Sequence, residues 1–139
     1  MDHETTSKKV GASFLRYEEV VVAYLFGSRA RGDFTRGSDV DFAILLSRSF
    51  KDPYDFVRLM GELATALSVK DEKINLVVLN DADLGLAYKV ISEGSVVFER
   101  DVEKRVDFEV CVLKSYLDFK PVLDQMRISL IREYTHGKA

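Results

Sequence analysis

Two aspartates, Asp39 and Asp41, are separated by one residue at the start of the apolar segment DVDFAILL (39–46). In a β-strand, residues i and i+2 project from the same face, so these carboxylates lie side by side, about 7 Å apart at the Cα level. Two like charges this close repel each other unless a cation lies between them. Mg²⁺ prefers carboxylate oxygens together with substrate phosphates. The pair therefore predicts a site for a divalent cation and a phosphorylated substrate.

A second group of candidate residues begins with Gly27 and Ser28, which end the preceding apolar run. Glycine lets an anion approach the backbone, and amide groups at the start of a short helix bind phosphate oxygens. The loop that follows contains Arg29, Arg31 and Arg36 and a single acidic residue, a local charge of +2 in a chain of net charge −3. A phosphate cradle, arginines and metal-binding carboxylates together suit nucleotidyl transfer.

A Gly-Ser turn or an Asp-x-Asp pair is common by itself, so the joint spacing carries the interpretation. Gly27-Ser28 is followed by ten residues and then by Asp39-Val40-Asp41, with an apolar strand predicted on either side. This pattern resembles the signature of the nucleotidyltransferase superfamily typified by DNA polymerase beta. The segment LFGSRARG…SDVDFAILL resembles its minimal nucleotidyltransferase (MNT) branch, and the resemblance extends from about Val20 to Phe98.

The resemblance implies a reaction, its cofactors and a partner. Asp39 and Asp41 would be the catalytic residues and would hold two Mg²⁺ ions, while Gly27 and Ser28 would hold the β- and γ-phosphates of ATP. Arg29 and Arg31 would also belong to the nucleotide site. Many MNT proteins are antitoxins that silence a HEPN-domain ribonuclease toxin by transferring AMP to one of its tyrosines. This chain would then act as an antitoxin on a HEPN partner.

One residue departs from the family pattern. A third carboxylate is expected on the strand EKINLVVLN, where this chain has Asn75. An amide carries no charge and cannot act as a base at neutral pH. Asp71 has the right pleat parity but lies about 13 Å back along an extended strand, and Glu72 has the wrong parity. Lys73 shares the face of Asn75, either to contact phosphates or as a solvated strand end.

These residues leave more than one function open. The first is a transferase that adenylylates a HEPN toxin. The second is an MNT protein, weakened or inactivated by Asn75, that neutralises its toxin by binding alone. A third, weaker alternative is a transferase acting on RNA ends or a small antibiotic. The net acidic charge disfavours nucleic acid as a partner, because phosphate binding normally needs a basic face.

The pattern of apolar residues predicts an α/β (α+β) fold with a mixed sheet of about four strands covered by helices. Strands are expected at 20–26, 39–46, 73–79 and 95–100 from their short apolar, β-branched runs. Helices are expected at 10–19, at 53–69 with Asp52 as its cap, and at 81–94 with Asp81 or Asp83 as its cap. Residues 1–9 are polar and are expected to fray.

The C-terminal segment, 101–135, has apolar residues at helical spacing, but Pro121 predicts two helices or one bent helix. Its stripe of Leu123, Met126, Leu130 and Tyr134 is explained equally by packing on the sheet or by a partner interface. Cys111 lies among apolar residues and is expected in the core.

Length and composition indicate one domain, 1–139, with a core at about 20–98. A single cysteine and the lack of a signal-like or membrane-spanning apolar run predict a cytoplasmic protein.

Overall fold

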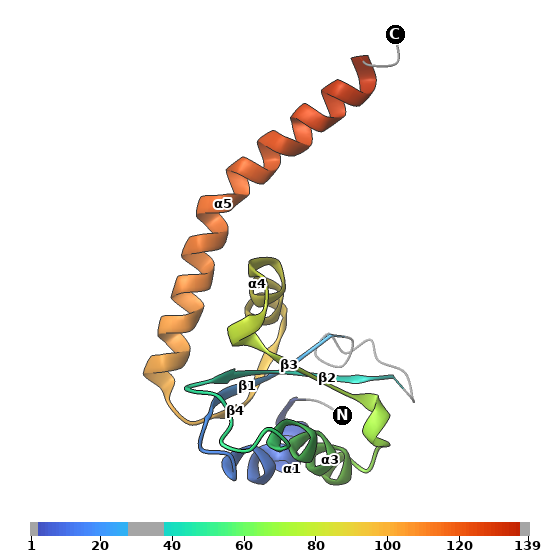
Figure 1. Ribbon diagram of the computed structural model, residues 1–139, viewed down its shortest axis with the longest axis vertical. Coiled ribbons are helices and arrows are strands. Elements are labelled where there is room, and N and C mark those ends of the chain that lie inside the picture. Colours follow the sequence, from blue (N-terminus) through green and yellow to red (C-terminus); the bar gives the residue numbers. More distant parts are fainter. Residues whose placement is uncertain (1–2, 28–37, 137–139) are drawn as a thin grey trace.

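The computed structural model describes residues 3–27 and 38–136, and places one mixed four-stranded sheet at the centre of the chain (Figure 1). The strand order is β3-β2-β1-β4, with β1 antiparallel to both β2 and β4 and with β2 parallel to β3. The strands are β1 (Val20–Phe26), β2 (Val40–Leu46), β3 (Ile74–Val78) and β4 (Ser95–Glu99). The helices are α1 (His3–Leu15), α3 (Asp55–Leu67), α4 (Leu84–Glu93) and α5 (Val102–His136), with short 3₁₀ turns η1 (Asp71–Lys73) and η2 (Leu79–Asp81). The mixed α+β architecture and all four strands expected from the sequence are confirmed.

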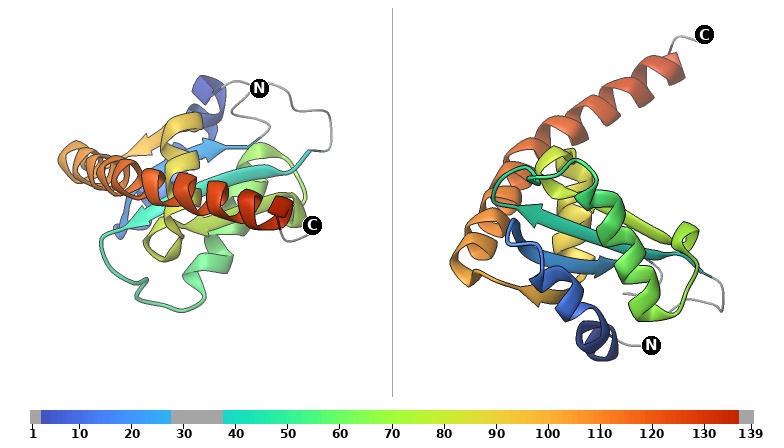
Figure 2. Two further views of the ribbon diagram at one scale, coloured as in Figure 1. Left: turned by 90° about the horizontal axis from the view of Figure 1, so that it is seen from above. Right: turned by 60° about the horizontal axis from the view of Figure 1, so that its bottom comes forward.

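Helices cover both faces of the sheet, α1 and α3 on one side and α4 with the first half of α5 on the other (Figures 1 and 2). Alternate residues of β1 therefore enter two different cores. Leu25 packs with Phe14 and Leu59 on the α1/α3 side, whereas Tyr24 packs with Val90 on the α4 side. Strands buried on both faces explain the continuous apolar runs of β1 and β2.

The N-terminal segment is helical, and the expectation that residues 1–9 fray is wrong for the part that the structure describes. α1 begins at His3, and its Thr6 is 1% exposed. The Ser7 hydroxyl donates a hydrogen bond of 2.8 Å to the carbonyl of Val97 in β4. Polar side chains anchor this turn to the sheet, a contact that composition does not reveal.

The end of α1 is held by an arginine that is distant in sequence and directly follows β4. Arg100 follows β4, and its guanidinium donates to the carbonyl oxygens of Leu15 at 2.9 Å, Tyr17 at 3.2 Å and Val20 at 2.9 Å. The last carbonyls of a helix have no partner within the helix, so a cation placed there satisfies them and complements the helix dipole. Arg100 therefore stabilises the end of α1 at Leu15, four residues before the end expected from the sequence.

The two short helices that follow begin close to where the sequence predicts. The carboxylate of Asp83 accepts the amide of Leu86 at 2.8 Å and caps α4, which resolves the choice between Asp81 and Asp83. The cap expected at Asp52 is wrong: α3 begins later, at Asp55, and its N-cap is Tyr54, which makes no side-chain cap hydrogen bond. Asp52 instead accepts the amide of Tyr54 ahead of the helix. Both helices turn their buried residues to the sheet.

α5 is one helix that runs through Pro121 without dividing in two. Its first half packs on α4, where the rings of Tyr88 and Tyr116 stack at 3.8 Å between centroids and 4° between planes. Its second half extends beyond the rest of the chain (Figure 1). Cys111 is exposed, so its expected place in the core is wrong: it lies on the side of α5 away from the body. Within the described residues, neither α5 nor any other helix combines the length and the apolar character needed to cross a bilayer.

Candidate active site

The sheet brings Asp39, Asp41 and Asn75 together at the end where β2 and β3 begin. β2 and β3 are parallel, and their register sets Asp41 directly beside Asn75. The Asn75 amide nitrogen, Nδ2, donates to Asp41 Oδ1 at 2.9 Å and lies 3.3 Å from Asp39 Oδ2. One amide group therefore bridges both carboxylates. The expectation that the two aspartates project from the same face is confirmed by this shared donor.

Gly27 closes the site on its other side. Phe26, at the end of β1, pairs with Asp41 across the antiparallel ladder, so Gly27 follows directly beside that carboxylate. A Cβ atom added to Gly27 would lie 2.2 Å from Asp41 Oδ2, and the residue has a φ of +74°. Both the space and the backbone conformation therefore require glycine here. Ser28, Arg29, Arg31 and Arg36, predicted for the phosphate and nucleotide site, lie outside the described residues.

Among the residues that the structure describes, Lys73 brings a positive charge to this edge of the site. Its Nζ lies 4.0 Å from Asp39 Oδ1, while 39% of the Lys73 side chain and 53% of the Asp39 side chain stay exposed. A solvent-exposed pair of this length contributes little to stability. Lys73 nevertheless reduces the negative charge where a phosphate would approach.

The structure supplies no substitute for the missing third carboxylate within residues 3–27 and 38–136. Asp71 lies in η1 and lines a hollow beside α3 with Arg58 and Glu62, apart from the aspartate pair. Over the same described residues, no group of three His, Cys, Asp or Glu side chains is arranged to hold a metal ion. Two carboxylates and an amide that can turn its oxygen inward still form a donor set that suits a hard divalent cation.

The family model for polymerase beta nucleotidyltransferases matches residues 8–103, which include every strand of the sheet and the whole aspartate site. The chain belongs to the polymerase beta nucleotidyltransferase family. The resemblance read from the Gly-Ser and Asp-x-Asp spacing is thereby confirmed.

Three individual proteins show which members of this family the chain is similar to. Protein adenylyltransferase MntA of Aphanizomenon flos-aquae (strain 2012/KM1/D3) is 30% identical over 104 residues, which cover 70% of this chain and 69% of MntA. A chain in a crystal structure of a toxin–antitoxin with AMP-PNP is 24% identical, with a TM-score of 0.68 over 87% of this chain and 98% of that one. A chain in a complex of tri-AMPylated Shewanella oneidensis HEPN toxin with MNT antitoxin is 21% identical, with a TM-score of 0.63 over 90% and 98%. The two structures share the fold of this nucleotidyltransferase.

The sequence predicted the residues of the site but did not reveal two contacts between them. Pleat parity predicts the face of Asn75, whereas its contact with both aspartates depends on the parallel pairing of β2 with β3. The contact of Gly27 with Asp41 depends on the antiparallel pairing of β1 with β2. Both pairings are non-local, so no spacing along the chain reveals them.

Proposed function

We propose that this nucleotidyltransferase is a protein adenylyltransferase antitoxin, which transfers AMP from ATP to a tyrosine of a HEPN ribonuclease toxin and so silences it. The observation that carries the proposal is the convergence of Asp39 and Asp41 on one amide donor, directly against the positive-φ Gly27. The similarity to MntA, named a protein adenylyltransferase, supports the choice of a protein as the acceptor.

Each residue of the site has a role in this proposal. Asp39 and Asp41 would hold Mg²⁺, and Gly27 would let the triphosphate approach the backbone with Ser28, Arg29 and Arg31 beside it. Bound Mg²⁺, expected as two ions, would neutralise phosphate charge and stabilise the attacking and leaving oxygens.

The proposed transfer makes one bond and breaks one at the α-phosphorus, and it releases one proton. The tyrosine hydroxyl oxygen attacks the α-phosphorus of ATP, and the bond from that phosphorus to the bridging oxygen of the β-phosphate breaks. AMP stays on the tyrosine, pyrophosphate leaves, and the hydroxyl proton passes to a carboxylate or to solvent. Asn75 cannot take this proton, because an amide is not a base at neutral pH.

Loss of one carboxylate slows such a reaction without abolishing it. General-base catalysis contributes about 10²–10⁴-fold, whereas enzymes accelerate reactions by about 10⁶-fold or more in total. An antitoxin that modifies each toxin molecule once also tolerates slow turnover. Asn75 is at the same time the observation that favours a second candidate, an antitoxin that neutralises its toxin by contact alone.

A transfer assay separates the two candidates. The protein is incubated with α-labelled ATP, Mg²⁺ and a candidate HEPN partner from the same genome, beside the variants Asp41→Asn and Asn75→Asp. Label on the partner that Asp41→Asn abolishes and Asn75→Asp increases is the result expected of an attenuated transferase. Absence of label while the ribonuclease is still inhibited, equally by the wild type and by Asp41→Asn, would overturn the transfer reaction in favour of binding alone.

A further inference from the structure

The second half of α5 is a projecting apolar surface that the transfer reaction does not use. Every side chain that the structure describes between Leu117 and Thr135 is exposed. We call residues 117–135 the arm. Figures 1 and 2 show the arm leaving the body beyond α4 as a single free helix. An isolated helix in water gains nothing from exposed leucine, methionine and phenylalanine side chains, so their presence needs an explanation.

The apolar stripe of the arm continues the face by which α5 packs on the body. Along the first half of α5 this face carries Phe108, Val112 and Tyr116, which are buried or half-buried against α4 and the sheet. Intervals of three and four residues keep the same face of a helix. They lead on to the residues that we call the inner stripe: Phe119, Leu123, Met126 and Leu130, which are 47%, 43%, 54% and 63% exposed.

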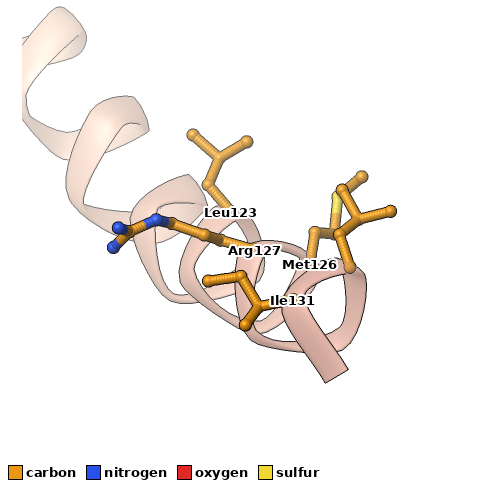
Figure 3. A pocket seen from close by; sticks show the side chains of 5 residues that line it. Leu123, Met126, Arg127 and Ile131 are labelled. Carbon is orange, nitrogen blue, oxygen red and sulfur yellow. The ribbon is translucent and has the colours of Figure 1, made fainter. Parts of the chain in front are cut away.

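The inner stripe also forms a shallow hollow of about 470 Å³, lined by Leu123, Met126, Arg127, Leu130 and Ile131 (Figure 3). Methionine and arginine are enriched in protein interfaces, and methionine adapts its shape to different partners. Tyr134, expected in the same stripe, has a side chain outside those that the structure describes. Of the two explanations that the sequence left open for this stripe, packing on the chain's own sheet is wrong.

The area of the inner stripe argues against a second copy of this chain as its occupant. Four side chains of this size, each about half exposed, present roughly 400 Å², whereas a stable interface buries about 800 Å² per partner. Two arms packed stripe to stripe would therefore be too small to hold a dimer. Another exposed row, Val102, Val106, Val110, Leu113 and Leu117, lies about 120° around α5 from the inner stripe, so one straight helix cannot cover both rows.

The direction of the arm indicates a larger occupant. The arm leans towards the side of the molecule at which β2 begins, where Asp39 and Asp41 lie (Figures 1 and 2). A protein seated on the inner stripe and against α4 would extend over that edge of the sheet. It would thereby gain the missing contact area and bring its own surface to the aspartates.

We propose that the inner stripe docks the protein substrate of the transferase, through an apolar helix face of that substrate. The proposal rests on the proposed function, and it names the surface that selects the partner. A helix whose apolar residues recur at three and four would lie along the stripe, and an acidic group beside it would pair with Arg127.

The test compares Met126→Glu with Ile128→Glu in the full chain. Both positions are exposed, at 54% and 46%, and two residues separate them by about 200° around the helix, so Ile128 is the matched control. Binding of the candidate HEPN partner is measured by titration calorimetry, and helix content by circular dichroism. We expect Met126→Glu to weaken binding at least tenfold and Ile128→Glu less than threefold, with unchanged helix content in both. Equal binding by the two variants would overturn the docking proposal.

Two further measurements separate this proposal from the transfer reaction. Asp41→Asn should abolish AMP transfer but change the partner's affinity less than threefold, because it leaves the inner stripe intact. Binding that depends on Met126 without any transfer supports docking and overturns the chemistry. Normal transfer, with the same KM for the partner in Met126→Glu, supports the chemistry and overturns docking. Sedimentation that shows a dimer lost only in Met126→Glu, with partner binding intact, would identify a second copy as the occupant and overturn docking as well.

Discussion

Replacing Asn75 with aspartate tests the site at its centre. In the present chain the amide nitrogen of Asn75 donates to Asp41 at 2.9 Å and to Asp39 at 3.3 Å. Asn75→Asp changes the shape of the side chain very little, but it exchanges a hydrogen-bond donor for a third negative oxygen. We therefore expect the variant to be less stable than the wild type without metal and to depend on Mg²⁺ for its stability.

The expected loss of stability in Asn75→Asp can be derived from these contacts. Two unit charges 4 Å apart in water interact by about 1 kcal/mol, and by more where the surroundings are less polar. Two such repulsions, together with two lost hydrogen bonds to charged acceptors at a solvent-exposed site, add to about 3 kcal/mol. For a domain of this size, that corresponds to a fall of roughly 10 °C in melting temperature. Added Mg²⁺ should reverse the fall, because the third carboxylate becomes a ligand.

The assay is thermal unfolding in EDTA and in a Mg²⁺ series, with Asn75→Ala as the control. The alanine variant loses the same hydrogen bonds but adds no charge, so it should show about a third of the destabilisation and no gain in Mg²⁺ affinity. High salt should reduce the penalty of the aspartate variant alone. Equal melting temperatures of the aspartate and alanine variants in EDTA, or equal stabilisation of both by Mg²⁺, would refute the electrostatic account of Asn75.

Three further predictions follow from contacts elsewhere in the chain. Gly27→Ala should lower the free energy of unfolding by at least 1–2 kcal/mol in chemical denaturation and weaken Mg²⁺ binding. The reasons are that φ of Gly27 is +74° and that the added Cβ would lie 2.2 Å from Asp41 Oδ2. Unchanged Mg²⁺ affinity would contradict this contact. Arg100→Lys should cost about 1–2 kcal/mol in the same measurement, since an ammonium cannot reach all three carbonyl groups that the guanidinium joins between the end of α1 and the start of β1. A lysine variant as stable as the wild type would refute that role. Burial and the neighbouring Glu62 raise the pKa of Tyr17 to about 12. Because the unfolded tyrosine titrates near 10, the stability that the neutral side chain contributes below about pH 10 should be lost as the pH rises towards 12. The melting temperature of Tyr17→Phe should therefore fall less than that of the wild type over this pH range.

The sequence alone specified the chemistry-bearing residues and the strands that hold them. Gly27, Asp39 and Asp41 could be recognised because a strand period of two and a fixed spacing are properties of neighbouring residues. The four strands could be predicted because a short apolar run is also a property of neighbouring residues. The runs of β1 and β2 are unbroken because these strands are buried on both faces. The departure at Asn75 was likewise visible in the sequence.

The tertiary structure decided what covers each surface. Periodicity predicts that a helix has an apolar face, but the partner of that face lies elsewhere in the chain or outside it. Thr6 is buried because α1 meets β4, whereas Cys111 is exposed because the body covers only one side of the first half of α5. Leu130 is exposed because the second half of α5 extends beyond the body. The bridge from Asn75 to both aspartates arises in the same way, from the pairing of strands that are distant in sequence. Burial and pairing depend on the whole fold, and the local sequence carries no direct record of them.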